Sequence, residues 1–455
     1  MPNLQPKYDK SLGVKPIIYF GLLMFSLLIV SCNKTTDPIN PVVVDISKPA
    51  STYPVDIATK WTDLQLQLIK NSPEITPPYA ARVLGYMGLA LYESVVPGMK
   101  GYQSLAGQLQ DLKALPKIDS TKEYSWGLAA NAAVYTLTKE MFANVNGNSQ
   151  SQIDSLRRNF ESSLKVDVSQ DVIDRSIRFG AEIATAIWEY AKVDGGHEAY
   201  LSNFPSSYVV QSGIGYWEPT NNQLQPLLPY WYKVRTFVTT NKKIAPPKPI
   251  PFSYREESDF FSEAQEVYLI SKNLSDEQRT IARFWADGST TITPPGHHFN
   301  IASIVIKSKN SSLPVAAETY CKLGIAINDA FIACWSAKYK YLLMRPQTYI
   351  RETLQKNWIS FLSTPPFPEY TSGHSSGAGA ASTILASIFG EQTSFIDNTY
   401  QSTLGTRSFS NFTDYANESS ISRVYGGIHY RNSCDKGLEN GRKIGYNVLN
   451  LKFKK

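Results

Sequence analysis

Cysteine is scarce in this sequence. Four cysteines occur in 455 residues, and three of them, Cys321, Cys334 and Cys434, lie in the body of the chain. An odd number of cysteines excludes a framework built entirely on paired disulfides. Cys321 and Cys334 lie in an apolar stretch of helical period, which predicts buried thiols. A bridge between Cys334 and Cys434 stays possible at this point.

Dense basic runs are also missing. The chain carries 45 Lys and Arg against 39 Asp and Glu, a formal net charge of +6, and no segment concentrates the excess. Nucleic-acid binding is therefore a poor explanation of the charge. No fixed-period repeat, low-complexity tract or strand-rich region is present. With 42% hydrophobic residues, the chain is long enough to bury a core of two packed subdomains.

The apolar run over residues 17–30 is shorter than the about 20 residues that a membrane-spanning helix needs. Lysines precede it and Ser31-Cys32 follows it, which is the pattern of a secretory signal, although a single membrane anchor is the alternative. The ending Ile-Val-Ser-Cys resembles the bacterial lipobox. We therefore expect residues 1–32 to be a lipoprotein signal peptide ending at Cys32, which would carry the lipid.

Residues 33–55 are rich in Pro, Thr and Asp, which predicts a flexible tether after the lipid anchor. The expected location is the bacterial cell envelope, on the periplasmic side or at the outer membrane. The lipid anchor would then be the only attachment to a membrane.

Helical period dominates from residue 56 onward. Helices are predicted over residues 80–92, 124–143, 171–193, 256–271, 276–286, 299–308, 316–344, 373–389 and 435–451. Between them, the composition of residues 196–252 shifts to Pro, Tyr, Trp and Asn, which predicts a long irregular connection packed by its aromatic side chains. We expect an all-α fold with helical bundles in two halves, an N-terminal subdomain over 56–252 and a C-terminal subdomain over 253–455.

The first candidate site segment contains Lys338 and Arg345. Seven residues are two helical turns, so both side chains, with Trp335, would leave one face of a helix. Pro346 disfavours helix at Arg345 and predicts that the helix ends there, where a guanidinium can fork onto two oxygens of a tetrahedral anion. The alternative is a solvated basic stripe.

The second segment is Ser372-Gly373-His374, which follows a Pro-rich stretch that cannot be helical. Ser372 or Thr371 would cap the helix that follows. The backbone N–H groups of Ser372 and Gly373 would then face outward at a helix N-terminus, which favours anions, with His374 within reach. The alternative is an ordinary cap with a surface histidine.

The third segment contains Arg423 and His429, six residues apart with Gly426-Gly427 between them. The glycine pair predicts a bend that lets both side chains reach one point. The alternative is a helix C-terminus whose Arg and His complement the dipole. Burying three cations together is prohibitive unless an anion lies among them, so the ordered set of segments predicts an oxyanion pocket.

Taken together, Lys-x6-Arg-Pro, Ser-Gly-His and Ser-Arg-x5-His resemble the signature of the vanadium-dependent haloperoxidases and the related type 2 phosphatidic acid phosphatase superfamily, over about residues 285–435. The flanks resemble the haloperoxidase branch. Trp335 and Phe367 fall where chloroperoxidases carry a Trp and a Phe beside the halide. The stretch from Asp287 resembles one whose Asp holds the anion-binding arginines.

The resemblance implies that vanadate is the cofactor and that hydrogen peroxide, halide and small organic acceptors are the partners. Lys338, Arg345, Arg423, Ser372 and Gly373 would bind the vanadate oxygens. His429 would be the axial ligand to vanadium, and His374 the acid–base group. Lys338 would also polarise the bound peroxide, and halide would leave as hypohalous acid.

In the phosphatase alternative the same pocket binds a phosphate ester, His429 is the nucleophile and His374 protonates the leaving alcohol. Trp335, Phe367 and Asp287 favour the haloperoxidase. A third possibility is an inactive surface lipoprotein. This possibility rests on one departure from the family pattern: Ser433 stands where the family usually carries an Asp that supports the last histidine. Thr371 in place of the usual Pro is the other departure.

Two more histidines, His297 and His298, follow a Pro-Pro-Gly turn. Adjacent side chains point to different sides of most backbones, so a shared metal is not expected. The hypothesis is that they line the pocket mouth and affect the access of halide or protons. His197, in a Gly-rich loop, receives no role.

Overall fold

The computed structural model describes residues 46–455. The predicted signal peptide with Cys32, and the predicted tether up to residue 45, lie outside the described residues. Residues 46–55, expected to belong to the tether, are instead packed on the fold. Ala50 is fully buried, and the Tyr124 N–H donates to the Ser47 hydroxyl at 3.0 Å. The packed part of the chain therefore begins before residue 56.

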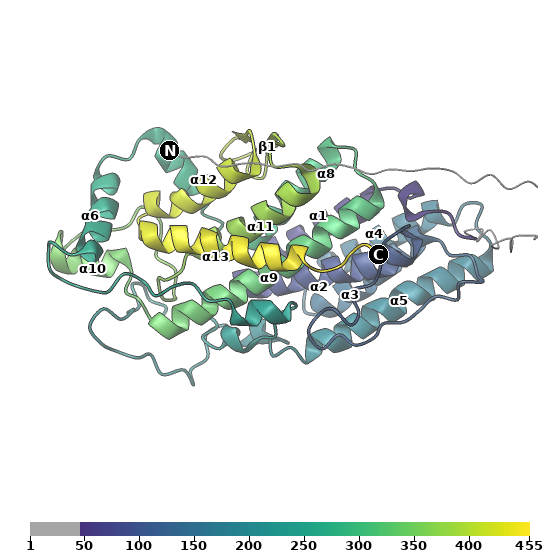
Figure 1. Cartoon of the computed structure of the whole chain (residues 1–455), viewed down its shortest axis with the longest axis horizontal. Helices are drawn as coiled ribbons and strands as arrows, with labels where there is room; N and C mark the ends of the chain where they lie inside the picture. The colour runs from purple at the N-terminus through teal and green to yellow at the C-terminus, as the bar shows by residue number, and fades with distance from the viewer. Residues whose placement is uncertain (1–45) are drawn as a thin grey trace, which may run out of the picture. The chain divides into compact units, whose positions relative to one another are not determined.

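The described residues form thirteen α-helices and one hairpin (Figure 1), and the all-α expectation is confirmed. The first half contains α1 (Asp56–Lys70), α2 (Pro77–Val95), α3 (Trp126–Met141), α4 (Gly147–Leu164) and α5 (Gln170–Lys192). The second contains α6 (Asp259–Lys272), α7 (Asp276–Phe284), α8 (Thr293–Ser308), α9 (Leu313–Tyr341), α10 (Pro346–Thr353), α11 (Gly373–Phe389), α12 (Phe412–Tyr425) and α13 (Arg431–Leu449). The antiparallel hairpin pairs β1 (Phe395–Asp397) with β2 (Arg407–Phe409).

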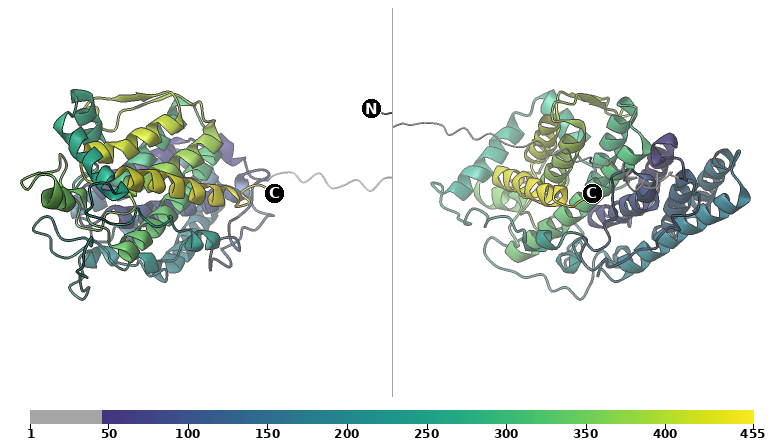
Figure 2. Two further views of the ribbon diagram at one scale, coloured as in Figure 1. Left: turned by 60° about the vertical axis from the view of Figure 1, so that its left-hand side comes forward. Right: turned by 45° about the vertical axis from the view of Figure 1, so that its right-hand side comes forward.

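Helices α2 and α9 pack with their backbones in contact. A Cβ placed on Gly324 would lie 2.7 Å from the Cα of Gly85, and one on Gly88 would lie 2.7 Å from the carbonyl carbon of Tyr320. Glycine is required where two helices approach this closely. The N-terminal helices lie directly against the later ones in two further views (Figure 2). The boundary predicted near residue 252 therefore separates two halves of one packed unit.

The irregular connection predicted over residues 196–252 is present and is anchored on α9. The buried carboxylate of Asp329 accepts hydrogen bonds from the N–H groups of Phe237 and Val238 at 2.8 and 3.0 Å, and from the Asn241 amide at 2.9 Å. With the Asn328 amide at 3.2 Å, four donors satisfy a carboxylate that burial alone would disfavour. The connection contains short 3₁₀ turns at Ala199–Ser202, Trp231–Lys233 and Thr239–Lys243; two others are Ala50–Thr52 and Val96–Gly98.

Several helix boundaries differ from the prediction, and the two differences nearest the site involve proline. Helix α9 ends at Tyr341 because Leu342 takes a left-handed conformation (φ 49°), and Pro346 begins α10 rather than ending α9. Helix α8 begins at Thr293, six residues before the predicted start, with prolines in its first turn. Proline is tolerated at the first positions of a helix because the N–H that it lacks has no intrahelical acceptor there.

Helices α11 and α13 also pack closely, because a Cβ on Gly441 would lie 2.9 Å from the backbone nitrogen of Ala380. Helix α12 ends beside them at Tyr425, and Gly427 (φ 74°) makes the predicted bend. The start of α11, the end of α12 and the turn before α13 lie together. Cys321, Cys334 and Cys434 are all buried and free, so the possible Cys334–Cys434 bridge is not formed.

Candidate active site

The turn before α11 holds the second motif. Ser372 is the N-cap, and its hydroxyl accepts from the Ser375 N–H at 3.2 Å. The Ser372 N–H does not face the pocket as predicted, because it donates to the Ser433 carbonyl at 3.2 Å. The N–H of Gly373, the first residue of α11, has no intrahelical acceptor and is the donor that the helix start offers to an anion.

Lys338, on α9, is fully buried, and its three N–H groups point at one turn of backbone. They donate to the carbonyls of Pro368 and Glu369 at 3.0 Å and of Thr371 at 2.6 Å. An ammonium has three donors, so this geometry uses all of them. Burial lowers the pKa of Lys338 to about 8. In this structure Lys338 fastens the turn that carries the Ser-Gly-His motif.

Arg345 is the residue before α10 and does not share a helix with Lys338, contrary to the prediction. Its Nε donates to the Phe367 carbonyl at 3.0 Å, and its Nη1 donates to the Ile428 carbonyl at 2.8 Å. The same Nη1 lies 3.2 Å from Nε2 of His429. Burial lowers the pKa of Arg345 to about 10. The first and third motifs therefore meet through the Arg345 guanidinium.

Arg423 lies in the last turn of α12 and is 3% exposed. Its Nη1 donates to the Trp285 carbonyl at 2.5 Å, whereas its Nε is buried with no partner among the described residues. Burial lowers the pKa of Arg423 to about 10. A buried guanidinium N–H without an acceptor is costly, and an anion would remove the cost.

His429 is oriented by a residue that was not among the predicted site residues. Its Nδ1 lies 2.7 Å from the Glu369 carboxylate, and its Nε2 faces the Arg345 guanidinium, which can only donate. Nδ1 therefore carries the proton, and Nε2 keeps its lone pair. Burial, and then Arg345 and Lys338, hold the pKa of His429 well below its usual range.

His374, in the first turn of α11, is the more accessible of the two motif histidines, with a side chain 13% exposed against 3% for His429. Its Nε2 has no hydrogen-bond partner among the described residues and lies 3.8 Å from a carboxylate oxygen of Asp287. Burial, and next Arg423, hold the pKa of His374 well below its usual range. The side chain is therefore a neutral imidazole that can take up a proton.

The resemblance implied that Asp287 holds an arginine, but in the structure it does not. Its carboxylate accepts from His297 Nδ1 at 3.0 Å and from the Tyr400 hydroxyl at 2.5 Å. No arginine in the described part of the chain lies within hydrogen-bond distance of it, although its charge still raises the pKa of Arg423 against the effect of burial. The reason is that α8 begins early, at Thr293, and brings His297 beside Asp287.

His297 and His298 do not line a pocket mouth, because both are at most 1% exposed. His297 lies between two carboxylates, with Nε2 2.8 Å from Asp397. Burial alone would lower its pKa, but the charges of Asp287 and Asp397 raise it to about 10. Burial lowers the pKa of His298 to about 3. The neighbours therefore differ in charge.

Trp335 and Phe367 form an apolar wall beside the cations. Their ring centroids lie 5.1 Å apart, and the Lys338 ammonium lies 4.9 Å from the Phe367 centroid. The Trp335 indole N–H donates to the Leu227 carbonyl, so the irregular connection fixes the ring. The wall therefore lies directly beside the buried Lys338 and Arg345 charges.

Glu369 is the functional residue that sequence reasoning missed. It is fully buried and accepts from His429, from the Tyr430 N–H at 3.1 Å and from the Ser433 hydroxyl at 2.8 Å. A signal was present, since a carboxylate within an otherwise apolar and Pro-rich stretch before Ser-Gly-His needs a buried partner. The partner could not be identified without the fold.

These groups fit a tetrahedral oxyanion. Lys338, Arg345 and Arg423 are all buried, and the Arg345 guanidinium lies 3.2 Å from His429 Nε2, while Arg423 Nε and His374 Nε2 are buried without partners among the described residues. Glu369 offsets one positive charge, and the others are held by backbone carbonyls, which do not neutralise them. Vanadate and phosphate both match this donor set, and the imidazole lone pair suits a vanadium or phosphorus centre.

Comparisons with known proteins agree with this geometry. A family profile, the VCPO second helical-bundle domain, matches residues 318–454. No curated protein sequence matches. Among solved structures, the chain is similar to a bacterial vanadium-dependent iodoperoxidase, with 34% identity and a TM-score of 0.76, over 86% of this chain and 95% of the other.

A bacterial vanadium-dependent chloroperoxidase in holo form is similar in fold at 18% identity, with a TM-score of 0.64, over 83% of this chain and 92% of the other. The apo form of a bacterial vanadium-dependent chloroperoxidase has 17% identity and a TM-score of 0.63, over 82% of this chain and 93% of the other. The identity to the iodoperoxidase, across nearly its whole length, is what establishes kinship rather than shared fold alone. This chain belongs to the vanadium-dependent haloperoxidase family.

Proposed function

We propose that this protein binds vanadate and oxidises halide with hydrogen peroxide to hypohalous acid, which halogenates small organic acceptors. The observation that carries the proposal is the set of three buried cations, of which Arg345 lies 3.2 Å from His429 Nε2, with the Trp335–Phe367 wall beside them. The 34% identity to a bacterial iodoperoxidase supports it.

His429 would supply the nitrogen ligand, and Arg345, Arg423 and the Gly373 N–H would hold oxygens of the vanadate. Bound vanadate would supply a Lewis acid that activates peroxide, and the oxidation state of vanadium would stay the same. Both arginines remain charged at neutral pH despite burial, because their pKa values stay near 10. They therefore neutralise negative charge in a site from which water is largely excluded, where such charges act most strongly.

His374 would move the proton. Its Nε2 is unpartnered, and the depressed pKa keeps the ring neutral in the resting site, so Nε2 is available to take a proton from hydrogen peroxide and to return it later. Asp287, 3.8 Å away, would stabilise the imidazolium that forms. Lys338 would support the turn at Pro368–Thr371, and it must release a carbonyl before it can polarise peroxide directly.

Iodide is the first halide to test, because the iodoperoxidase is about twice as similar in sequence as the chloroperoxidase. The Trp335–Phe367 wall is an aromatic surface suited to a large, weakly hydrated anion next to the Lys338 charge. The same donors would also accept a phosphate ester, with His429 as nucleophile, so a phosphatase is kept as an outcome of the test.

The test uses the chain from residue 33, reconstituted with orthovanadate. We expect peroxide-dependent iodination of a phenolic dye that requires vanadate and is lost by at least about 10³-fold in His429→Ala. Phosphatase activity on a phosphomonoester is measured beside it, with and without vanadate. Phosphatase activity that vanadate inhibits, with no halogenation of iodide, bromide or chloride, contradicts the proposal. If the chain shows neither halogenation nor phosphatase activity, the result favours the inactive lipoprotein.

We also propose that the protein is exported and anchored through a lipid on Cys32. The apolar run and the lipobox-like ending at Ser31-Cys32 support this. Among the described residues, no helix combines the length and apolarity needed to cross a bilayer. Labelled palmitate should be incorporated into the full chain but not into Cys32→Ala. The Cys32→Ala chain should also be lost from the membrane fraction. Membrane retention of unlabelled Cys32→Ala contradicts the anchor.

A further inference from the structure

We propose that Glu369 is the positioning residue for His429, and that Glu369 and Ser433 together replace the aspartate that the family usually carries at position 433. The inference rests on the proposed function insofar as His429 is taken as the residue that binds the anion. It goes further by assigning the support of that histidine to a residue from a different segment, 60 positions before it in the chain.

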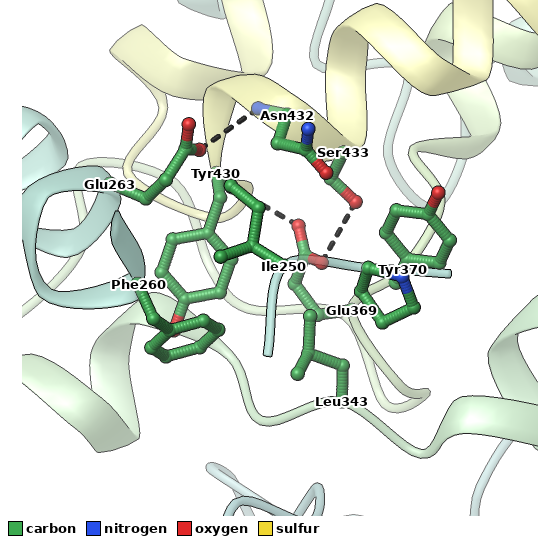
Figure 3. A pocket seen from close by; sticks show the side chains of 10 residues that line it. Ile250, Phe260, Glu263, Leu343, Glu369, Tyr370, Tyr430, Asn432 and Ser433 are labelled. Atoms are coloured by element: carbon green, nitrogen blue, oxygen red, sulfur yellow. Dashed lines mark hydrogen bonds between the residues drawn. The ribbon is translucent and has the colours of Figure 1, made fainter. Parts of the chain in front are cut away.

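Three donors fix the Glu369 carboxylate. His429 Nδ1 lies 2.7 Å from Oε1, and the Tyr430 N–H donates to the same oxygen at 3.1 Å. The Ser433 hydroxyl donates to Oε2 at 2.8 Å. Figure 3 shows the carboxyl group reaching toward Tyr430 and Ser433 at the start of α13. Both oxygens are therefore held on one side by the helix that follows His429.

The backbone of Glu369 is equally constrained. Its N–H donates to the Leu343 carbonyl at 3.0 Å, and its own carbonyl accepts from Lys338 Nζ at 3.0 Å. A side chain with a fixed backbone and a fully bonded carboxylate has little freedom. It can therefore hold an imidazole in one orientation and one tautomer, with the lone pair of Nε2 toward the anion site.

Ser433 explains why the carboxylate that bonds His429 comes from Glu369 and not from α13. A serine is too short to reach His429, and in this structure its hydroxyl reaches Glu369 instead. An aspartate on α13 would bring its own carboxylate to the space that the Glu369 carboxylate occupies. A small cavity beside Glu369 is lined by Ile250, Phe260 and Glu263, among others. The two arrangements should therefore be interchangeable.

The experiment measures vanadate binding to the apo chain by equilibrium dialysis, without peroxide or halide. The variants are Glu369→Ala, Glu369→Gln, Ser433→Asp and the double change Glu369→Ala/Ser433→Asp. Glu263→Ala is the matched control, since Glu263 lines the same cavity but accepts from the Asn432 N–H rather than from His429. Circular dichroism checks that each variant is folded.

Glu369→Ala should weaken vanadate binding by about 10- to 100-fold, the usual effect of removing the partner of a ligating histidine. Glu369→Gln keeps an acceptor for the His429 Nδ1 proton, so its affinity for vanadate should fall by less than about threefold. The double change should recover at least about tenfold over Glu369→Ala, and Glu263→Ala should bind as the parent chain does. Ser433→Asp alone places two carboxylates together and should weaken binding.

Vanadate binding by folded Glu369→Ala equal to that of the parent chain would overturn the inference, and so would a double variant no better than Glu369→Ala. If Glu369→Ala does not fold, Ser433→Asp decides: vanadate binding equal to that of the parent chain overturns the inference, and weakened binding by a folded variant supports it. Absence of halogenation together with the expected binding pattern would reject the proposed function and leave the role of Glu369 standing.

Discussion

Backbone carbonyls hold the buried cations of this site. Lys338 donates to three carbonyls, and Arg345 and Arg423 donate to others. A carbonyl satisfies an N–H but carries no full charge, so the positive charges persist. Carboxylates in the same places would have neutralised the field that attracts an anion. The site thus meets the hydrogen-bond demands of burial and keeps its electrostatic function.

His297 shows the opposite solution, since two carboxylates flank it with no exposure to solvent. Its folded-state pKa of about 10 lies above the usual value of about 6.5. A group of this kind contributes stability that is fully present below about pH 6.5 and is lost as pH rises through about 10.

We therefore predict that the free energy of unfolding of the apo chain falls between pH 7 and pH 9.5 by up to about 3 kcal/mol through His297, at about 1.4 kcal/mol per pKa unit. His297→Gln should be less stable than the parent chain at pH 7 and should show a flatter pH dependence. Urea unfolding at both pH values measures this. Parallel pH curves for the two chains would contradict the role assigned to His297.

At the scale of elements, close helix contacts set the geometry of the pocket. Helix α11 supplies Gly373 and His374, and α13 follows His429 directly. Gly441 brings the two backbones together, because a Cβ there would lie 2.9 Å from the nitrogen of Ala380. The contact therefore controls how far the start of α11, with its Gly373 N–H, lies from His429.

Gly441→Ala should destabilise the chain by more than about 2 kcal/mol, because helix backbones must move apart, and it should weaken vanadate binding as well. Gly147→Ala is the control, since no atom lies within 4 Å of a Cβ at that helical position. It should change stability by less than about 0.5 kcal/mol. Thermal unfolding and vanadate dialysis of both variants check this, and equal effects would contradict it.

At the scale of the whole molecule, one core joins the helices from both halves of the sequence. Buried side chains of α2, such as Leu84, and of α9, such as Ile325, belong to the same hydrophobic cluster. The irregular connection closes over α9 through Asp329. The site-bearing half therefore has an apolar face that only the N-terminal half covers.

A chain limited to residues 253–455 should accordingly fail to form a cooperative fold, even though it carries every residue that we propose binds vanadate. We expect weak thermal cooperativity, binding of an apolar dye and no measurable vanadate binding, against a sharp transition for residues 46–455. A cooperative transition of the short chain, with vanadate binding, would show that the halves are independent.

The helices most accurately predicted are those with a clear apolar face or cap, such as α5 and α11. Helix α4 was missed because few of its residues are buried, chiefly Ser149 and Ile153. Its start depends on a cap instead, as the Asn146 side chain accepts from the Ser149 N–H. Its apolar stripe of Ile153, Leu156, Phe160 and Leu164 has helical spacing but is thin among many Ser, Asn and Arg residues, so the signal along the chain is weak.

The sequence by itself determined the inventory of the site: three cations, two histidines and a helix start, in an order and spacing found in one superfamily. Tertiary structure decided which donor faces the anion and which carboxylate serves which histidine. The Ser372 N–H is used by Ser433, Asp287 pairs with His297, and Glu369 holds His429. These partners come from segments far apart in the chain, and hydrogen bonding depends on ångström-scale approach that no local pattern specifies.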